Sequence, residues 1–330
     1  MPNNTSLFDK TNYILRFSLL SVLLLNFLCA PTAQAQELRR FEFSEPKMGT
    51  TFRMVFYAER EEEATQAAAA AFERIDELNR IFSDYQEDSE VSRLSQSAGS
   101  GEKVPVSDEL WEVLHYARQL SKKSNGAFDV SIGPLSKLWR RAFRQMEFPQ
   151  PEKITAARAL VNYRDIRLYR KHRRVRLCKA GMRIDLGGIA KGYTVDAVYR
   201  VLLERGINRA LVDGGGDIYA GDPPPGQSGW EVQMVALEEG VDPQRIVLSR
   251  RAIASSGSTY KFLEWNGERY SHIIDPRTGL GITETDIINV AADNCMQADA
   301  FASTLSIIND LERTRLLDRF PNVALQKTNE

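Results

Sequence analysis

The sequence contains few of the residues that build zinc sites or disulfide frameworks. Three cysteines and three histidines stand among 330 residues. Neither a Cys-x-x-Cys pair nor a His-Glu-x-x-His motif occurs, so spacing gives no support for a zinc site. Cys178 and Cys295 lie in the main part of the chain. An oxidising compartment would permit a disulfide between them, although isolated cysteines are more often small buried hydrophobic residues.

Net charge is almost absent as well. The formal charge is −1 at pH 7, so no long-range field attracts nucleic acid, and we expect no nucleic-acid partner. One dense basic cluster lies between residues 164 and 176. Its cations alternate along two expected strands, which favours a solvated strand face over a docking surface for an acidic partner.

Long apolar runs are missing except near the N-terminus. The run from Phe17 to Cys29 follows Lys10 and Arg16 and precedes the Ala-x-Ala pattern that ends at Ala35. It is shorter than the ~20 residues that a membrane-spanning helix needs. These features predict a cleavable signal peptide over residues 1–35 and one exported, periplasmic domain over residues 36–330. An uncleaved anchor in the inner membrane is the alternative.

Strand and helix patterns are interspersed without strict alternation, which predicts a mixed α+β domain and not a doubly wound Rossmann sheet. Alternating apolar residues predict a strand over 52–56, and steps of four and three predict a helix over 64–82. Ser107 is a suitable N-cap for a second helix. Further elements are expected as a hairpin (166–169 and 174–177), a helix (189 to about 206), strands (210–212 and 287–291) and a last helix (about 298–308).

A run of small residues, DLGGIAKG, occupies positions 185–192. Glycines let the backbone approach a ligand closely, and a helix that begins near Ile189 would present free N–H groups to an anion. The run matches neither GxGxxG nor a Walker A loop. On spacing alone, an ordinary tight turn is the favoured interpretation, because isolated glycine motifs are weak signals.

Three other segments combine polar groups with turns. His272 stands beside DPRTG and is either a general base or a surface histidine. Asp299 and Ser303 are four residues apart, so on a helix they share a face. They suit a hard cation with oxygen ligands, or they form an ordinary polar pair. The turn over 213–217, DGGGD, either shapes a pocket or reverses the chain.

Taken together and in order, these motifs resemble one family, the ApbE-type FAD:protein FMN transferases. The matching segments are MGT (48–50), IFSDYQEDSEVSRLS (81–95), GAFDVSIGPLSKLW (126–139), DLGGIAKGY (185–193), VDGGGDI (212–218), SSG (255–257), HIIDPRTG (272–279) and ADAFAS (298–303).

The resemblance implies a Mg²⁺-dependent enzyme. It would transfer the FMN half of FAD to a threonine or serine hydroxyl of an exported redox protein and release AMP. Two alternatives remain open, an FAD pyrophosphatase that gives FMN and AMP, and a flavin-binding protein without chemistry. A periplasmic solute-binding protein is disfavoured, because it would show two doubly wound lobes.

The resemblance also assigns residues. It implies metal ligation by the Gly188 carbonyl, Asp299 and Ser303, where the family usually has threonine. His272 resembles a histidine that assists transfer. Contacts with FAD are implied for Met48, Tyr85, Ala127, Phe128, Asp129, Asp185, Lys191 and Ile273.

Overall fold

The computed structural model describes residues 37–234, 244–257, 262–284 and 287–326. The predicted signal peptide and its cleavage site lie outside these ranges. Residues 38–330 form one unit. Within the described ranges, no helix is both long enough and apolar enough to cross a bilayer.

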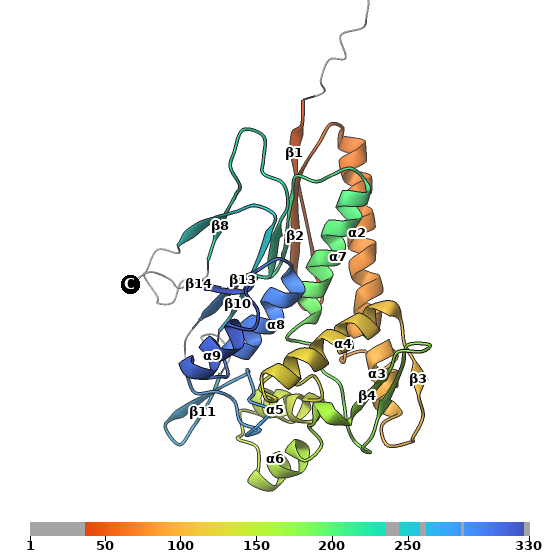
Figure 1. The fold of residues 1–330 in the computed structure, drawn as a ribbon, viewed down its shortest axis with the longest axis vertical. Helices are drawn as coiled ribbons and strands as arrows, with labels where there is room; N and C mark the ends of the chain where they lie inside the picture. The colour runs from red at the N-terminus through yellow and green to blue at the C-terminus, as the bar shows by residue number, and fades with distance from the viewer. Residues whose placement is uncertain (1–36, 235–243, 258–261, 285–286, 327–330) are drawn as a thin grey trace, which may run out of the picture. The chain divides into compact units, whose positions relative to one another are not determined.

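A seven-stranded sheet runs through this unit in the order β1-β2-β6-β7-β10-β13-β14 (Figure 1). Every strand pair in it is antiparallel, so the predicted α+β class is confirmed and a doubly wound sheet is ruled out. Its strands are β1 (Arg39–Lys47), β2 (Thr50–Ala58), β6 (Ala210–Gly214), β7 (Ile218–Ala220), β10 (Arg251–Ser256), β13 (Ile288–Ala292) and β14 (Ala324–Gln326).

The two faces of the sheet bury different layers, because successive side chains of a strand point in opposite directions. Phe52, Met54 and Phe56 of β2 are fully buried in the main core, as their alternation predicts. Val55, on the opposite face, packs in a second cluster with Trp230. That cluster is covered by a hairpin of β8 (Trp230–Gln233) and β9 (Arg245–Leu248).

Helices cover the first face. α2 (Glu61–Phe82) and α7 (Ala190–Glu204) lie side by side (Figure 1). α2 buries a stripe that includes Ala64, Ala68 and Ile75, which confirms its predicted periodicity. α8 (Cys295–Leu305) packs on α7, β10 and β13.

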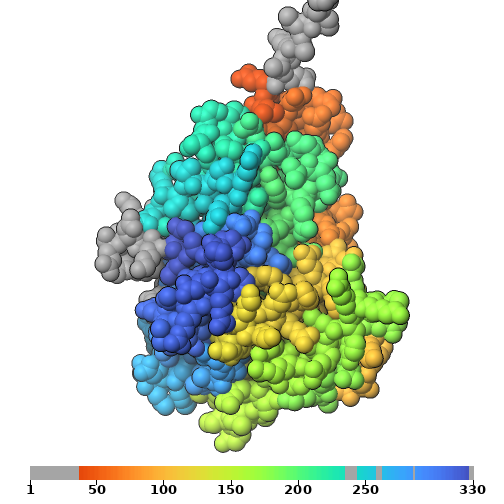
Figure 2. All heavy atoms as spheres, in the orientation of Figure 1, coloured from red at the N-terminus to blue at the C-terminus, as the bar shows by residue number. Residues whose placement is uncertain are grey.

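A smaller layer completes the core. It contains α3 (Glu90–Gln96), α4 (Asp108–Lys123), a 3₁₀ turn (Tyr163–Asp165) and a sheet of β3 (Val104–Pro105), β5 (Arg174–Leu177) and β4 (Ile166–Tyr169). The Ser107 hydroxyl accepts the Leu110 N–H, so the predicted N-cap is confirmed. The β4–β5 hairpin has its predicted bounds and protrudes at one edge of the view in Figure 2. Nearly all of its cations are exposed, as a solvated strand face requires.

Several elements were not predicted from the sequence. They include α5 (Gly133–Gln145), α6 (Pro151–Arg158), β11 (Phe262–Trp265), β12 (Glu268–Ser271) and α9 (Asp310–Leu317). α8 begins at Cys295, three residues before the expected start at Ala298, because Asn294 caps it and accepts the Gln297 N–H. Cys178 and Cys295 are both free thiols.

Candidate active site

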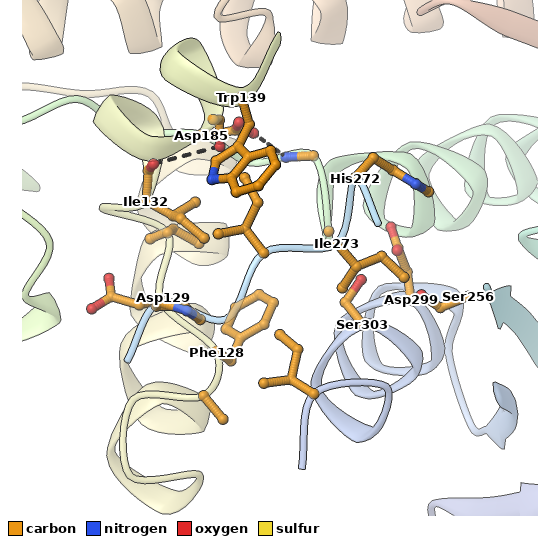
Figure 3. A pocket seen from close by; sticks show the side chains of 18 of the residues that line it. Phe128, Asp129, Ile132, Trp139, Asp185, Ser256, His272, Ile273, Asp299 and Ser303 are labelled. Carbon is orange, nitrogen blue, oxygen red and sulfur yellow. Dashed lines mark hydrogen bonds between the residues drawn. The ribbon is translucent and has the colours of Figure 1, made fainter. Parts of the chain in front are cut away.

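A cavity of about 380 Å³ brings together segments that are far apart in the sequence. Eleven of the twelve predicted site residues line it: Tyr85, Ala127, Phe128, Asp129, Asp185, Gly188, Lys191, His272, Ile273, Asp299 and Ser303. In Figure 3, Asp299, Ser303 and Ser256 lie on one side, near His272 and Ile273, while Ile132, Trp139 and Asp185 lie on another. The glycine run, the segment of His272 and the helix of Asp299 and Ser303, each ambiguous singly, therefore meet at one cavity, whereas the DGGGD turn is not part of its lining.

Met48 is not among the residues that line this cavity. It occupies the β1–β2 turn with φ 51° and packs, partly buried, against the main core. The same turn contacts the DGGGD turn closely, since a Cβ on Gly215 would lie 2.1 Å from the Thr50 Oγ1. The predicted contact of Met48 with FAD stays a prediction.

Close backbone contacts explain why glycines occur in the segment 185–192. The Asp185 N–H donates to the Val130 carbonyl, and the Asp185 Oδ1 accepts the Gly187 N–H, both at 2.8 Å. A Cβ on Gly188 would lie 2.9 Å from the Ser303 Oγ. A Cβ on Gly192 would lie 2.3 Å from the Cys295 carbonyl oxygen. Both glycines therefore permit contact with α8, and Gly188 places its backbone beside the Ser303 hydroxyl.

Lys191 lies near two buried carboxylates, those of Asp217 and Asp299. Its ammonium pairs with Asp217, which is 2% exposed. Asp299 accepts the Gly192 N–H at 3.0 Å. Burial and, to a smaller extent, repulsion by Asp299 raise the Asp217 pKa to about 7, although Lys191 opposes this rise. Burial also raises the Asp299 pKa. One ammonium therefore serves two carboxylates that resist ionisation.

Lys191 supplies one positive charge beside the two carboxylates of Asp217 and Asp299, and a second cation would balance the remaining negative charge. A magnesium ion prefers oxygen ligands, and the Asp299 carboxylate, the Ser303 hydroxyl and the Gly188 backbone supply three kinds of oxygen on one cavity wall. In the described part of the chain, no cluster of three or more His, Cys, Asp or Glu residues has metal-site geometry. The donor set therefore contains a single carboxylate and fits a cation that keeps other ligands.

The Asp129 carboxylate has a structural task. Its Oδ1 accepts the backbone N–H and hydroxyl of Ser131, at 2.8 and 2.7 Å, and its Oδ2 accepts the Tyr163 N–H at 2.7 Å. In Figure 3 the carboxylate points away from His272 and Asp299. The adjoining Phe128 ring faces the cavity instead. Asp129 thus fixes the loop that presents Phe128.

His272 follows β12 directly and is exposed at the cavity. Hydrogen bonds tie down the turn that follows it. Arg277 binds both carboxylate oxygens of Asp275 at 3.0 to 3.1 Å, and the Trp139 Nε1–H donates to the Gly279 carbonyl at 2.9 Å. The DPRTG residues therefore anchor the segment that carries His272.

Arg140, on α5, is a cavity residue that the sequence patterns do not single out. Its Nη1 donates to the Asp84 Oδ2 at 2.5 Å and its Nη2 to the Asp185 Oδ2 at 2.8 Å. Ser136, four residues earlier on the same helix, also lines the cavity, but this spacing alone does not reveal the partners of Arg140.

An antiparallel α+β fold and a cavity lined by both charged and apolar side chains define the class of this protein. A model of the ApbE family matches residues 48–325. The chain is 30% identical over 312 residues to the FAD:protein FMN transferase of Treponema pallidum, which covers 89% of this chain and 85% of that protein. The FAD:protein FMN transferase of Haemophilus influenzae is 31% identical over 291 residues, 83% of this chain and 82% of that protein.

Solved structures agree with this match. The flavin transferase ApbE from Vibrio cholerae superposes with a TM-score of 0.78 at 26% identity, over 88% of this chain and 94% of that one. The ApbE protein from Thermotoga maritima also gives 0.78, at 27% identity, over 87% of this chain and 94% of that one. The chain belongs to the ApbE family.

Proposed function

We propose that this protein is an FAD:protein FMN transferase that attaches FMN to a threonine or serine hydroxyl of an exported redox protein and releases AMP. One observation carries the proposal: a single cavity gathers His272, Lys191, Asp299, Ser303 and the Gly188 backbone from separate parts of the chain. Relatives that share most of this chain carry that name. The N-terminal pattern of the sequence supports an exported, periplasmic location.

Magnesium fits the site. The Gly188 carbonyl, Asp299 and Ser303 would hold it, and a bound divalent ion would neutralise charge on the pyrophosphate of FAD. Phosphoryl transfer depends mainly on positioning and charge stabilisation. Lys191 adds a fixed positive charge at the same wall, because Asp217 anchors its ammonium. We infer that Asp185, which lines the cavity, accepts a hydrogen bond from FAD.

His272 is suited to take the proton of the acceptor hydroxyl at a ring nitrogen. The hydroxyl oxygen then bonds to the FMN phosphorus, the bond from that phosphorus to the bridging oxygen breaks, and AMP leaves with the bridging oxygen. The products are a phosphoester-linked flavin, AMP and one proton. The exposed position of His272 gives a large acceptor access to it.

The direct test combines the protein with FAD, Mg²⁺ and an exported redox domain that has an exposed threonine. We expect the intact mass of the acceptor to rise by one FMN unit, with one AMP released for each. AMP formed without any acceptor gain would favour the pyrophosphatase. Tight FAD binding without AMP under any condition would favour the flavin-binding protein.

The role of His272 is tested by His272→Ala. A positioned general base contributes ~10²–10⁴-fold, so the transfer rate should fall by that amount while FAD still binds. His115→Ala is the matched control, because His115 is exposed on α4 and stacks on Trp111. Near wild-type transfer by His272→Ala would remove this residue from the mechanism.

A further inference from the structure

The guanidinium of Arg140 joins three groups at the cavity. It bridges Asp84 and Asp185 with two separate nitrogen atoms. Its central carbon also lies 4.2 Å from the centroid of the Tyr85 ring. Tyr85, Arg140 and Asp185 all line the cavity. One side chain therefore contacts two loops that face the ligand, and it comes from a third element, α5.

The charges around Arg140 make it necessary for this arrangement. The side chains of Asp84 and Asp185 are only 14% and 9% exposed. Burial raises the Asp84 pKa, repulsion by Asp185 raises it further, and Arg140 opposes both effects. Without the guanidinium, two carboxylates would repel each other next to a site for an anionic dinucleotide. Arg140 thus offsets the repulsion between the two carboxylates and fixes the direction of the Asp185 carboxylate.

Tyr85 is 75% exposed although it lines the cavity. A guanidinium over an aromatic face is attractive, so Arg140 fixes the plane of the ring. Aromatic pairs stack with favourable energy, and the exposed part of the ring is available to a planar ligand.

We propose that Arg140 is a positioning residue of the FAD site, which sets the Tyr85 ring and the Asp185 carboxylate in a fixed relation to each other. A planar ring of FAD would stack on Tyr85 while the same half of the dinucleotide donates a hydrogen bond to Asp185. This inference rests on the proposed function. It predicts that Arg140 serves recognition of one half of FAD and takes no part in the transfer itself.

The test uses Arg140→Ala, Arg140→Lys and the matched control Arg141→Ala. Arg141 is the next residue on α5, is exposed, and bonds to Gln145. Lysine keeps the charge of Arg140 but lacks the planar fork that bridges two carboxylates and stacks on a ring. FAD affinity is measured by quenching of flavin fluorescence. Riboflavin and ADP, as competitors of FAD, report separately on the two halves.

Arg140→Ala should weaken FAD binding about 10- to 100-fold, the effect of losing hydrogen bonds to a charged group. The KM for FAD should rise while kcat at saturating FAD changes little, since uniform binding is lost. The loss should fall on one competitor, riboflavin or ADP, and spare the other. Arg140→Lys should lie between Arg140→Ala and wild type, and Arg141→Ala should match wild type.

Equal FAD affinity in Arg140→Ala and Arg141→Ala would overturn the inference while leaving the proposed function intact. An equal loss for both competitors would also overturn it, because a merely structural defect would not distinguish the two halves. If Arg140→Ala does not fold, Arg140→Lys decides by the same criteria. Failure of the wild-type protein to bind FAD would instead refute the proposed function.

Discussion

At the scale of single residues, the contact between Gly188 and Ser303 is the most sensitive feature of the proposed metal site. A Cβ at position 188 would lie 2.9 Å from the Ser303 Oγ and 3.2 Å from its Cβ. Real Cβ atoms almost never approach that closely, so the flexible hydroxyl would have to turn away. Alanine at 188 therefore disturbs Ser303 without removing it.

We expect Gly188→Ala and Ser303→Ala to raise the Mg²⁺ concentration for half-maximal transfer by similar factors, on the order of 10-fold. The double variant should show little further increase, because Gly188→Ala displaces the same hydroxyl that Ser303→Ala removes and contacting residues are not additive. Titration of Mg²⁺ in the transfer assay measures all three. Fully additive effects, or an unchanged metal requirement, would show that Ser303 is not a ligand.

The cavity residues show what a sequence can reveal about a site. Asp299 and Ser303 were predictable as a pair because helical spacing places them on one face. Arg140 was not, since its partners Asp84 and Asp185 lie 56 and 45 residues away. Asp129 shows the converse limit. Its motif placed it correctly at the cavity, yet only the structure shows that its carboxylate holds Ser131 and Tyr163.

At the scale of elements, α7 and α8 are joined by a carboxylate. The Asp196 oxygens accept the Cys295 N–H at 2.8 Å and the Met296 N–H at 2.9 Å. The first N–H groups of a helix have no partner within it, so Asp196 satisfies two donors of α8 from α7. This contact fixes the start of the helix that carries Asp299 and Ser303.

This cap should make the free energy of unfolding depend on pH. Burial raises the Asp196 pKa from 3.8 to about 6. Between these values the folded protein retains a proton that the unfolded chain has lost, so the contribution of Asp196 to stability falls as pH rises through the window. Asp196→Asn removes that titration. The free energy of unfolding of the variant minus that of wild type should therefore increase from pH 4 to pH 7, by at most about 3 kcal/mol.

Urea unfolding at several pH values measures the difference, and titrations common to both proteins cancel. At neutral pH the amide still loses one of the two acceptors, so the variant also tests the cap itself. A difference that stays constant from pH 4 to pH 7 would contradict a strongly perturbed Asp196.

Elements with strong local signals were predictable, and weaker ones were not. The hairpin of β4 and β5 has its predicted bounds because apolar and basic residues alternate on both strands. The predicted start of α8 was wrong, because the cap of this helix depends partly on Asp196, which is 99 residues away from Cys295 in the sequence. β11 (FLEW) and β12 (ERYS) are equally short but do not alternate apolar and polar residues, so they carry no strand pattern. They are defined by pairing with each other.

At the scale of the whole molecule, the cavity wall is assembled from residues between Tyr85 and Ile307. β2 pairs with β6, a distant segment of the chain, with Phe52 opposite Gly214, and no local pattern indicates this pairing. Motif order could identify the family, but only this sheet order brings the loops of α5, α7 and α8 to one place. Ligand binding should therefore be coupled to the stability of the entire unit.

That coupling gives a prediction for thermal unfolding. A ligand at 100 times its Kd stabilises the folded state by about 2.7 kcal/mol, which corresponds to a rise in Tm of about 4 °C for a unit of this size. FAD with Mg²⁺ should produce this rise in a single transition, because all parts of the wall unfold together.

Asp299→Asn should lose the increment that Mg²⁺ adds and keep part of the increment from FAD alone, because Asp185, Tyr85 and Lys191 remain. Scanning calorimetry with each ligand separately and combined measures these increments. A shift confined to one of two transitions would mean that the cavity belongs to a part of the chain that unfolds independently.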